Sequence, residues 1–235
     1  MLEKLKKEVC EANLKLVDLG LVLFTWGNVS GLDKESGYMV IKPSGVPYDN
    51  MKPNDMVVVD MDGNLVEGKY NPSSDTATHI EIYKSFEGVG GVVHTHSKWG
   101  TIFSQAGRNI PALGTTHSDN FYGDIPCTPA LTKSQVKGEY ERQTGVQIVN
   151  TFKEQKIDHI AVPAVVVTNH APFAWGKNAM KAVENAAVLE YCAEMAYYTL
   201  DINPDAKINK YILDKHYLRK HGKDAYYGQR KKIND

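Results

Sequence analysis

Residues 92–97 read VVHTHS, and this short stretch sets the expected architecture. Two valines, which are typical of a buried strand, lead directly into His94, Thr95 and His96. Residues i and i+2 of a strand point to the same face, so the spacing predicts both imidazoles on one face and Thr95 on the other. A second β-branched run, AVVVTNH at 164–170, ends in His170. Two buried strands that end in this way predict a sheet that gathers three imidazoles at one edge.

Three imidazoles at one sheet edge indicate a metal site. Three protein ligands with an open fourth position are the arrangement of a catalytic zinc, whereas a structural zinc more often has cysteine ligands. A histidine at the end of a strand is by itself usually a surface or hydrogen-bonded residue, so the prediction depends on the combination. The remaining histidines have weaker context, and we expect solvent or packing roles for His79, His117, His159, His216 and His221.

The composition excludes several classes of protein. Of 235 residues, 42% are hydrophobic, and 27 Lys+Arg balance 28 Asp+Glu, which argues for a sizeable core and against nucleic-acid binding. No apolar run approaches the ~20 residues of a membrane span, and the charged N-terminus predicts an amphipathic helix rather than a signal peptide. Cys10, Cys127 and Cys192 lie far apart. We therefore expect packing roles for the thiols and a cytoplasmic protein.

The chain reads as one domain over 1–235, in which strands and helices are mixed. The Asp62-Gly63 pair between two apolar runs predicts a hairpin, and hairpins indicate a layered α/β sheet that is not purely parallel. The expected strands lie within 21–31, which would end in a Gly-Asn loop, and within 38–45, 55–68, 90–96, 110–114, 125–129 and 161–176. The expected helices cover about 1–20, 71–88, 97–107, 134–155, 177–200 and 206–220.

Three loops share a chemistry that suits an anion: GNVSG at 27–31, KPSG at 42–45 and PSSD at 72–75. Ser73 and Ser74 come just before a predicted helix, whose N-terminal N–H groups and dipole favour negative charge. Lys42 adds a formal charge. Each loop alone is more simply a turn or a helix cap, but together with a metal site they indicate a phosphorylated substrate. None is a dinucleotide fingerprint, so no nucleotide cofactor is expected.

The motifs TWGNVS, KPSG, PSSDT.TH, HTHS, GTTH.D, FAWGKNA and DKHYLRKHG..AYYGQ together resemble the class II aldolase/epimerase family. The resemblance runs from the first helix to Gln229, and the tail RKKIND beyond it is given no role. It implies an α/β fold, a three-layer α/β/α sandwich with a mixed, mostly antiparallel central sheet. It also implies a homotetramer with active sites at subunit boundaries, in which segment 206–235 contributes to a neighbour's site.

The resemblance also implies roles for single residues. The metal, usually zinc, would be held by His94, His96 and His170 with Asp75 beside it, although manganese or cobalt can substitute at such ligands. Asp119 and Tyr227 match the family's acid/base pair, with Tyr227 entering from a neighbouring subunit. Without the resemblance, Asp119 reads as a turn aspartate and Tyr227 as part of a polar tail; His216 and Arg219 either assist the site or form a charged helix face. The phosphate would lie among Asn28, Lys42, Ser44, Gly45, Ser73 and Ser74.

The implied activity is a 4-epimerisation that interconverts L-ribulose 5-phosphate and D-xylulose 5-phosphate. The alternative is an aldolase that cleaves a ketose 1-phosphate to dihydroxyacetone phosphate and an aldehyde. Aldolases of this family typically have Glu where this chain has Asp75, which favours the epimerase. A third reading is a non-enzymatic assembly module, against which the three histidines count. The arabinose, ascorbate and xylulose routes all use the same sugar phosphate and stay open.

Overall fold

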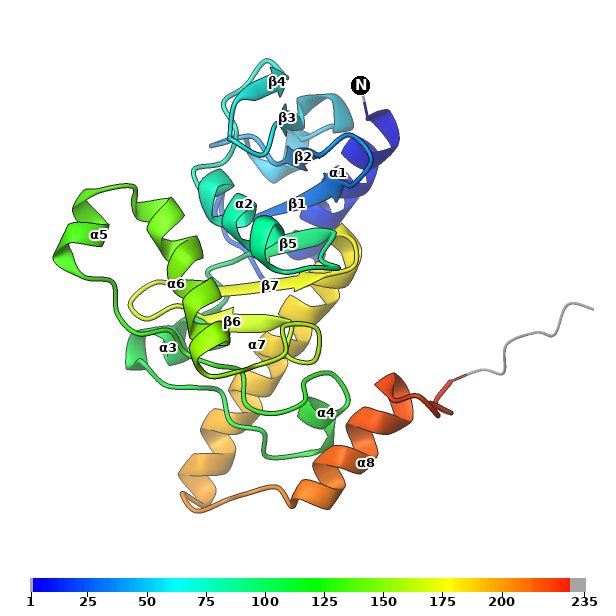
Figure 1. Cartoon of the computed structure of the whole chain (residues 1–235), viewed down its shortest axis with the longest axis vertical. Coiled ribbons are helices and arrows are strands. Elements are labelled where there is room, and N and C mark those ends of the chain that lie inside the picture. Colours follow the sequence, from blue (N-terminus) through cyan, green and yellow to red (C-terminus); the bar gives the residue numbers. More distant parts are fainter. Residues whose placement is uncertain (1, 229–235) are drawn as a thin grey trace, which may run out of the picture.

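The computed structural model describes residues 2–228, and a twisted sheet with helices on both faces forms its body (Figure 1). The strands are β1 Asn28–Asp33, β2 Tyr38–Ile41, β3 Val57–Val59, β4 Leu65–Glu67, β5 Gly91–His94, β6 Ala164–Val166 and β7 Pro172–Gly176. The α-helices are α1 Glu3–Asp18, α2 Thr76–Ser85, α3 Lys98–Ala106, α4 Thr115–Ser118, α5 Lys133–Lys137, α6 Tyr140–Glu154, α7 Ala179–Ile202 and α8 Lys210–His221, with short 3-10 turns at Tyr48–Asn50 and Pro53–Asp55.

The sheet has the strand order β4-β3-β2-β1-β5-β7-β6. Every pairing between these described strands is antiparallel, and the parallel element is an isolated bridge between Cys127 and Val166. Helices α1 and α7 pack on one face, while α2 and α6 cover the other (Figure 1). There Phe86 and Phe152 pack on the fully buried Trp175 of β7. The expected three-layer α/β/α architecture is confirmed, with a sheet that is antiparallel throughout its named strands.

A glycine pair lets the central strand β5 run close to the start of α7. A Cβ atom on Gly91 would lie 2.3 Å from the Asn178 carbonyl, and one on Gly90 would lie 2.3 Å from the carbonyl oxygen of Lys177. Neither site can hold a larger residue without moving the backbone. The glycines therefore set the position of β5, and with it the position of the histidine that ends the strand.

Several elements differ from expectation. Residues 21–27 do not form a strand: a turn joins the Trp26 amide to the Leu23 carbonyl, Phe24 is 79% exposed, and β1 begins at Asn28. The run 161–176 is a hairpin of two strands. The helix expected over 134–155 divides around Gly138 into α5 and α6, and segments 110–114 and 125–129 make only isolated bridges. An apolar run alone therefore does not fix where a strand starts.

The C-terminal helix α8 packs on the short helix α4, away from the sheet (Figure 1). The helix expected over 206–220 is present and begins at Lys210. Gln229 and the tail RKKIND lie outside the described residues. Within residues 2–228, no helix is both long enough and apolar enough to cross a membrane.

Candidate active site

His94, His96 and His170 come together at one edge of the sheet. Their candidate ligand atoms all lie within 4.8 Å of one another. The elements that carry these histidines differ from the predicted ones. Strand β5 ends at His94, so His96 belongs to the loop that follows, and His170 lies in the loop between β6 and β7 rather than at the end of a strand. Asn169 before it adopts a left-handed conformation (φ 60°), which turns the hairpin loop.

Hydrogen bonding and burial prepare these rings for a cation. Nδ1 of His94 donates to the Pro172 carbonyl at 3.0 Å, which leaves the lone pair on Nε2. Burial, reinforced by neighbouring His94, lowers the pKa of His170 to about 3, and burial also lowers the pKa of His96. Nδ1 of His170 is buried and has no hydrogen-bond partner among the described residues. Neutral imidazoles with free lone pairs fit a divalent metal ion.

Asp75 places a carboxylate beside the histidines from the N-terminus of α2. One carboxylate oxygen accepts a hydrogen bond from Nδ2 of Asn28 at 2.7 Å, and Asn28 pairs with His94 across β1 and β5. Burial alone would raise the pKa of Asp75, but the fields of His94 and His79 and the Asn28 hydrogen bond lower it overall. A carboxylate held beside the imidazoles adds to the attraction for a cation.

A cavity of about 520 Å³ joins the histidines to the predicted phosphate cradle. Loop contacts shape the cradle: the Ser44 amide donates to the Asn71 carbonyl, and the Ser73 amide to the Lys42 carbonyl. Lys42 is almost fully buried, and burial lowers the pKa of its ammonium to about 8. The structure thus brings the metal and phosphate candidates to one cavity, whose lining includes Asn28, Lys42, Ser44, Gly45, Ser73, Ser74, Asp75, His94, His96 and His170.

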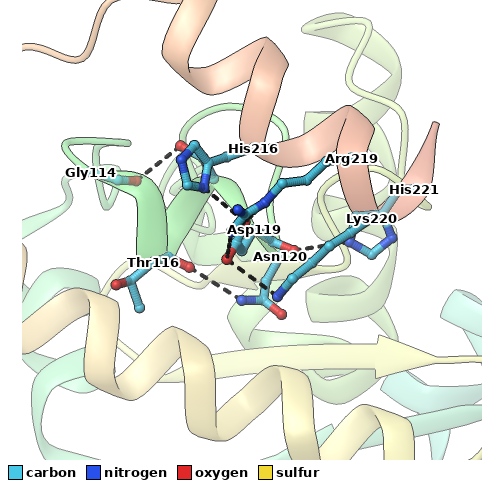
Figure 2. A network of polar contacts seen from close by, with 9 residues as sticks. Gly114, Thr116, Asp119, Asn120, His216, Arg219, Lys220 and His221 are labelled. Carbon is cyan, nitrogen blue, oxygen red and sulfur yellow. Dashed lines mark hydrogen bonds and ion pairs between the residues drawn. The ribbon is translucent and has the colours of Figure 1, made fainter. Parts of the chain in front are cut away.

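Asp119 and Tyr227 are not among the described residues that line this cavity. Asp119 directly follows α4 and lies under the basic side of α8 (Figure 2). Its carboxylate accepts from Nη2 of Arg219 at 2.9 Å and from Nδ1 of His216 at 3.0 Å, and pairs with Lys220 at 3.3 Å. Burial opposes ionisation, but these three cationic or donor groups bring the pKa of Asp119 below its usual value. The carboxylate is therefore charged and held in place.

Tyr227 lies beside the same basic groups. Its ring centroid is 5.0 Å from the Arg219 guanidinium and 4.5 Å from Nζ of Lys220, and the residue is 60% exposed. Arg219 and Lys220 thus hold both Asp119 and Tyr227 on one side of the molecule, apart from the histidine cavity of their own chain. Their roles stay predictions.

The cavity also contains residues that the sequence patterns did not single out. Trp26 packs near the His96 ring, with a centroid separation of 6.1 Å, and Tyr140 lies 6.0 Å from the His170 ring. Glu141 also lines the wall. Trp26 belongs to the motif TWGNVS, so the sequence contained a signal that could have indicated this residue. Tyr140 and Glu141 begin a helix whose start the sequence did not define, so no pattern distinguished them.

The fold and this cavity define a known class of protein. The profile of the family described as Class II Aldolase and Adducin N-terminal domain matches residues 7–197. The chain belongs to this family.

Within the family, the chain is similar to curated proteins named L-ribulose-5-phosphate 4-epimerase UlaF. The proteins of that name from Salmonella paratyphi A and Salmonella typhi are each 56% identical to it over 230 residues, covering 97% of this chain and 100% of theirs.

Solved structures support the fold. An L-fuculose 1-phosphate aldolase superimposes with a TM-score of 0.78 at 24% identity, covering 91% of this chain and 94% of the other. YgbL from Escherichia coli, described as a putative aldolase/epimerase/decarboxylase, gives 0.72 at 22% identity, covering 91% and 97%. At these identities the likeness concerns the fold alone.

Proposed function

We propose that this protein is an L-ribulose-5-phosphate 4-epimerase, which interconverts L-ribulose 5-phosphate and D-xylulose 5-phosphate. The observation that carries the proposal is 56% identity to proteins of that name over 97% of the chain. The single cavity that unites three histidines with a serine- and lysine-lined cradle supports it. Such a cavity suits a substrate with a phosphate at one end and oxygens for a metal at the other.

The reaction needs a carbon–carbon bond to break. C4 of a 2-ketopentose is not adjacent to the carbonyl, so its hydrogen is not acidic, and deprotonation cannot invert that carbon. Removal of the proton from the C4 hydroxyl allows the C3–C4 bond to cleave, which gives a dihydroxyacetone enediolate and glycolaldehyde phosphate. When the aldehyde presents its other face, re-addition gives the inverted centre. The cradle around Lys42 and Ser44 would hold the phosphate while the aldehyde end turns.

We propose zinc as the metal, held by His94, His96 and His170 with Asp75 beside them. When bound, a divalent metal would supply Lewis-acid stabilisation of the negative charge that develops as the bond breaks. The neutral imidazoles leave the ion its charge. Asn28 holds the Asp75 carboxylate at the site through the 2.7 Å hydrogen bond.

The proton transfers need groups on both faces of the aldehyde, and we assign them to Asp119 and Tyr227. Because both residues lie outside the cavity of their own chain, we propose that a neighbouring subunit supplies the pair, within a homotetramer. Arg219 and Lys220 contact both side chains, which supports delivery of the two as one unit.

The free thiols at Cys10, Cys127 and Cys192 support the expected cytoplasmic setting.

A coupled assay with L-ribulose 5-phosphate tests the proposal: D-xylulose 5-phosphate should form, and chelation should stop its formation. The aldolase alternative predicts release of dihydroxyacetone phosphate from a ketose 1-phosphate. Formation of that product without any xylulose 5-phosphate would replace the epimerase by the aldolase.

A further inference from the structure

A strip of polar side chains runs through the interior between β1 and α2. Asn28 and Ser30, at i and i+2 on β1, face Asp75, His79 and Tyr83, which follow one another at four-residue intervals from the N-cap of α2 onward. The spacing of these residues along the strand matches their spacing along the helix, because two strand residues advance about 6.7 Å and four helix residues about 6 Å. Asn28 therefore meets Asp75, and Ser30 meets His79 and Tyr83. This strip connects the candidate metal site to the protein core.

His79 is the central member of the strip and is fully buried. Its Nδ1 lies 2.7 Å from Oγ of Ser30, and that oxygen lies 2.9 Å from the hydroxyl of Tyr83. A neutral imidazole carries one N–H, on either Nδ1 or Nε2. Nε2 is buried and has no hydrogen-bond partner among the described residues. A buried polar atom without a partner costs about 1–3 kcal/mol, so a native acceptor is expected.

Asp75 is the candidate acceptor that helix geometry offers. Side chains on a helix lean toward its N-terminus and meet the residue one turn earlier, and the residue one turn before His79 is Asp75, whose carbonyl accepts the His79 amide at 3.1 Å. The two side chains are close enough for each to shift the pKa of the other. Asn28 bonds one carboxylate oxygen, Oδ2, and the other stays available for a second donor.

We propose that His79 is a positioning residue for Asp75: its Nε2–H donates to the Asp75 carboxylate, and Ser30, donating to Nδ1, fixes this tautomer. The carboxylate is then held by Asn28 and His79 in the orientation that it needs beside the three histidines. The proposal rests on the metal-dependent function proposed above. Groups that orient a metal-site carboxylate typically contribute about 10- to 100-fold in metal affinity or activity.

The simpler role for His79 is packing alone, as a core histidine that bonds Ser30 and lies against Phe173 with ring centroids 6.1 Å apart. Two substitutions separate the roles. A glutamine amide nitrogen lies as many bonds from Cα as Nε2 of histidine, and an asparagine amide nitrogen as many as Nδ1. His79→Gln therefore keeps the donor toward Asp75, whereas His79→Asn keeps only the contact with Ser30.

The test is the affinity for Zn²⁺, measured by competition with a chromophoric chelator, beside thermal unfolding of each variant. His79→Asn should weaken zinc binding by about 10- to 100-fold, and His79→Gln should stay within about threefold of wild type. Asp75→Asn supplies a double-mutant cycle, because a residue that acts through Asp75 has no further effect once that carboxylate is gone. Additive losses, or equal losses in the Gln and Asn variants, would overturn the proposal.

Two further variants control for folding. Ile82→Val trims a fully buried residue of the same helix and should lower the unfolding temperature without changing zinc affinity. Ser30→Ala removes the hydroxyl that fixes the tautomer and should weaken zinc binding; wild-type affinity in that variant would overturn the role of Ser30. Turnover of L-ribulose 5-phosphate is measured separately, so a coupled zinc effect without epimerisation would reject the proposed function and leave the role of His79 intact.

Discussion

Lys42→Met tests the phosphate cradle most directly. The Lys42 ammonium is almost fully buried, donates to the carbonyls of Val46 at 3.0 Å and Pro43 at 3.3 Å, and lies 4.8 Å from the centre of the Tyr48 ring. An ammonium has three N–H groups, which leaves one for the cavity that Lys42 lines. Methionine keeps much of the side-chain volume and removes the charge and this donor.

The expected loss is one charge-assisted hydrogen bond to the phosphate. Such a bond contributes about 1.5–3 kcal/mol, and each ~1.4 kcal/mol is a factor of ten, so KM for L-ribulose 5-phosphate should rise by about 10- to 150-fold. Burial holds the pKa of Lys42 at about 8. In wild type, KM should therefore climb above pH 8 as the ammonium loses its proton, whereas KM of the variant should lack this dependence.

The same titration should affect stability. Because the pKa of Lys42 is about 8 in the folded protein and 10.5 ordinarily, the unfolded chain binds more protons between these values, and the free energy of unfolding rises with pH across that window. Lys42→Met should lose this rise, because methionine does not titrate.

Steady-state kinetics and urea unfolding at several pH values would measure both effects. Lys34→Met is the matched control, since Lys34 is exposed on the turn between β1 and β2, and neither KM nor stability should change. A KM for Lys42→Met within threefold of wild type, in a folded protein, would refute the assignment of Lys42 to the phosphate.

Three further outcomes are expected. His96→Asn should remove the bound metal, as read by elemental analysis, and nearly all activity; retention of stoichiometric metal would contradict the three-histidine site. Tyr227→Phe should reduce epimerisation at least tenfold with the metal still bound, and unchanged turnover would exclude it from proton transfer. Mixing these two variants should restore part of the activity if subunits exchange, because a mixed tetramer contains sites with an intact His96 and a neighbour's intact Tyr227; no recovery despite exchange would argue against a shared site.

Local sequence patterns predicted most of the elements. The turn at Asp62-Gly63 separates β3 from β4, and the two serines and the aspartate precede α2 as expected. The strand expected within 21–31 starts later for a physical reason: Leu23 and Phe24 are 64% and 79% exposed, so hydrophobicity at these positions does not signal burial. The split of the helix over 134–155 at Gly138 was equally hidden, because one glycine lowers helix stability by only about 1 kcal/mol.

By itself, the sequence supplied the candidate groups: histidines that suit a metal, a carboxylate, hydroxyls and a lysine that suit a phosphate, and the motifs of the family that combines them. Only the tertiary structure decided which of these groups share a site. Antiparallel pairing of β5 with β1 and β7 sets His94 beside Asn28 and near the loop of His170. These contacts join residues that are far apart in the sequence, so no local sequence pattern predicts them. The tertiary structure also placed Asp119 under α8, outside the cavity, because α8 packs on α4 and not on the sheet.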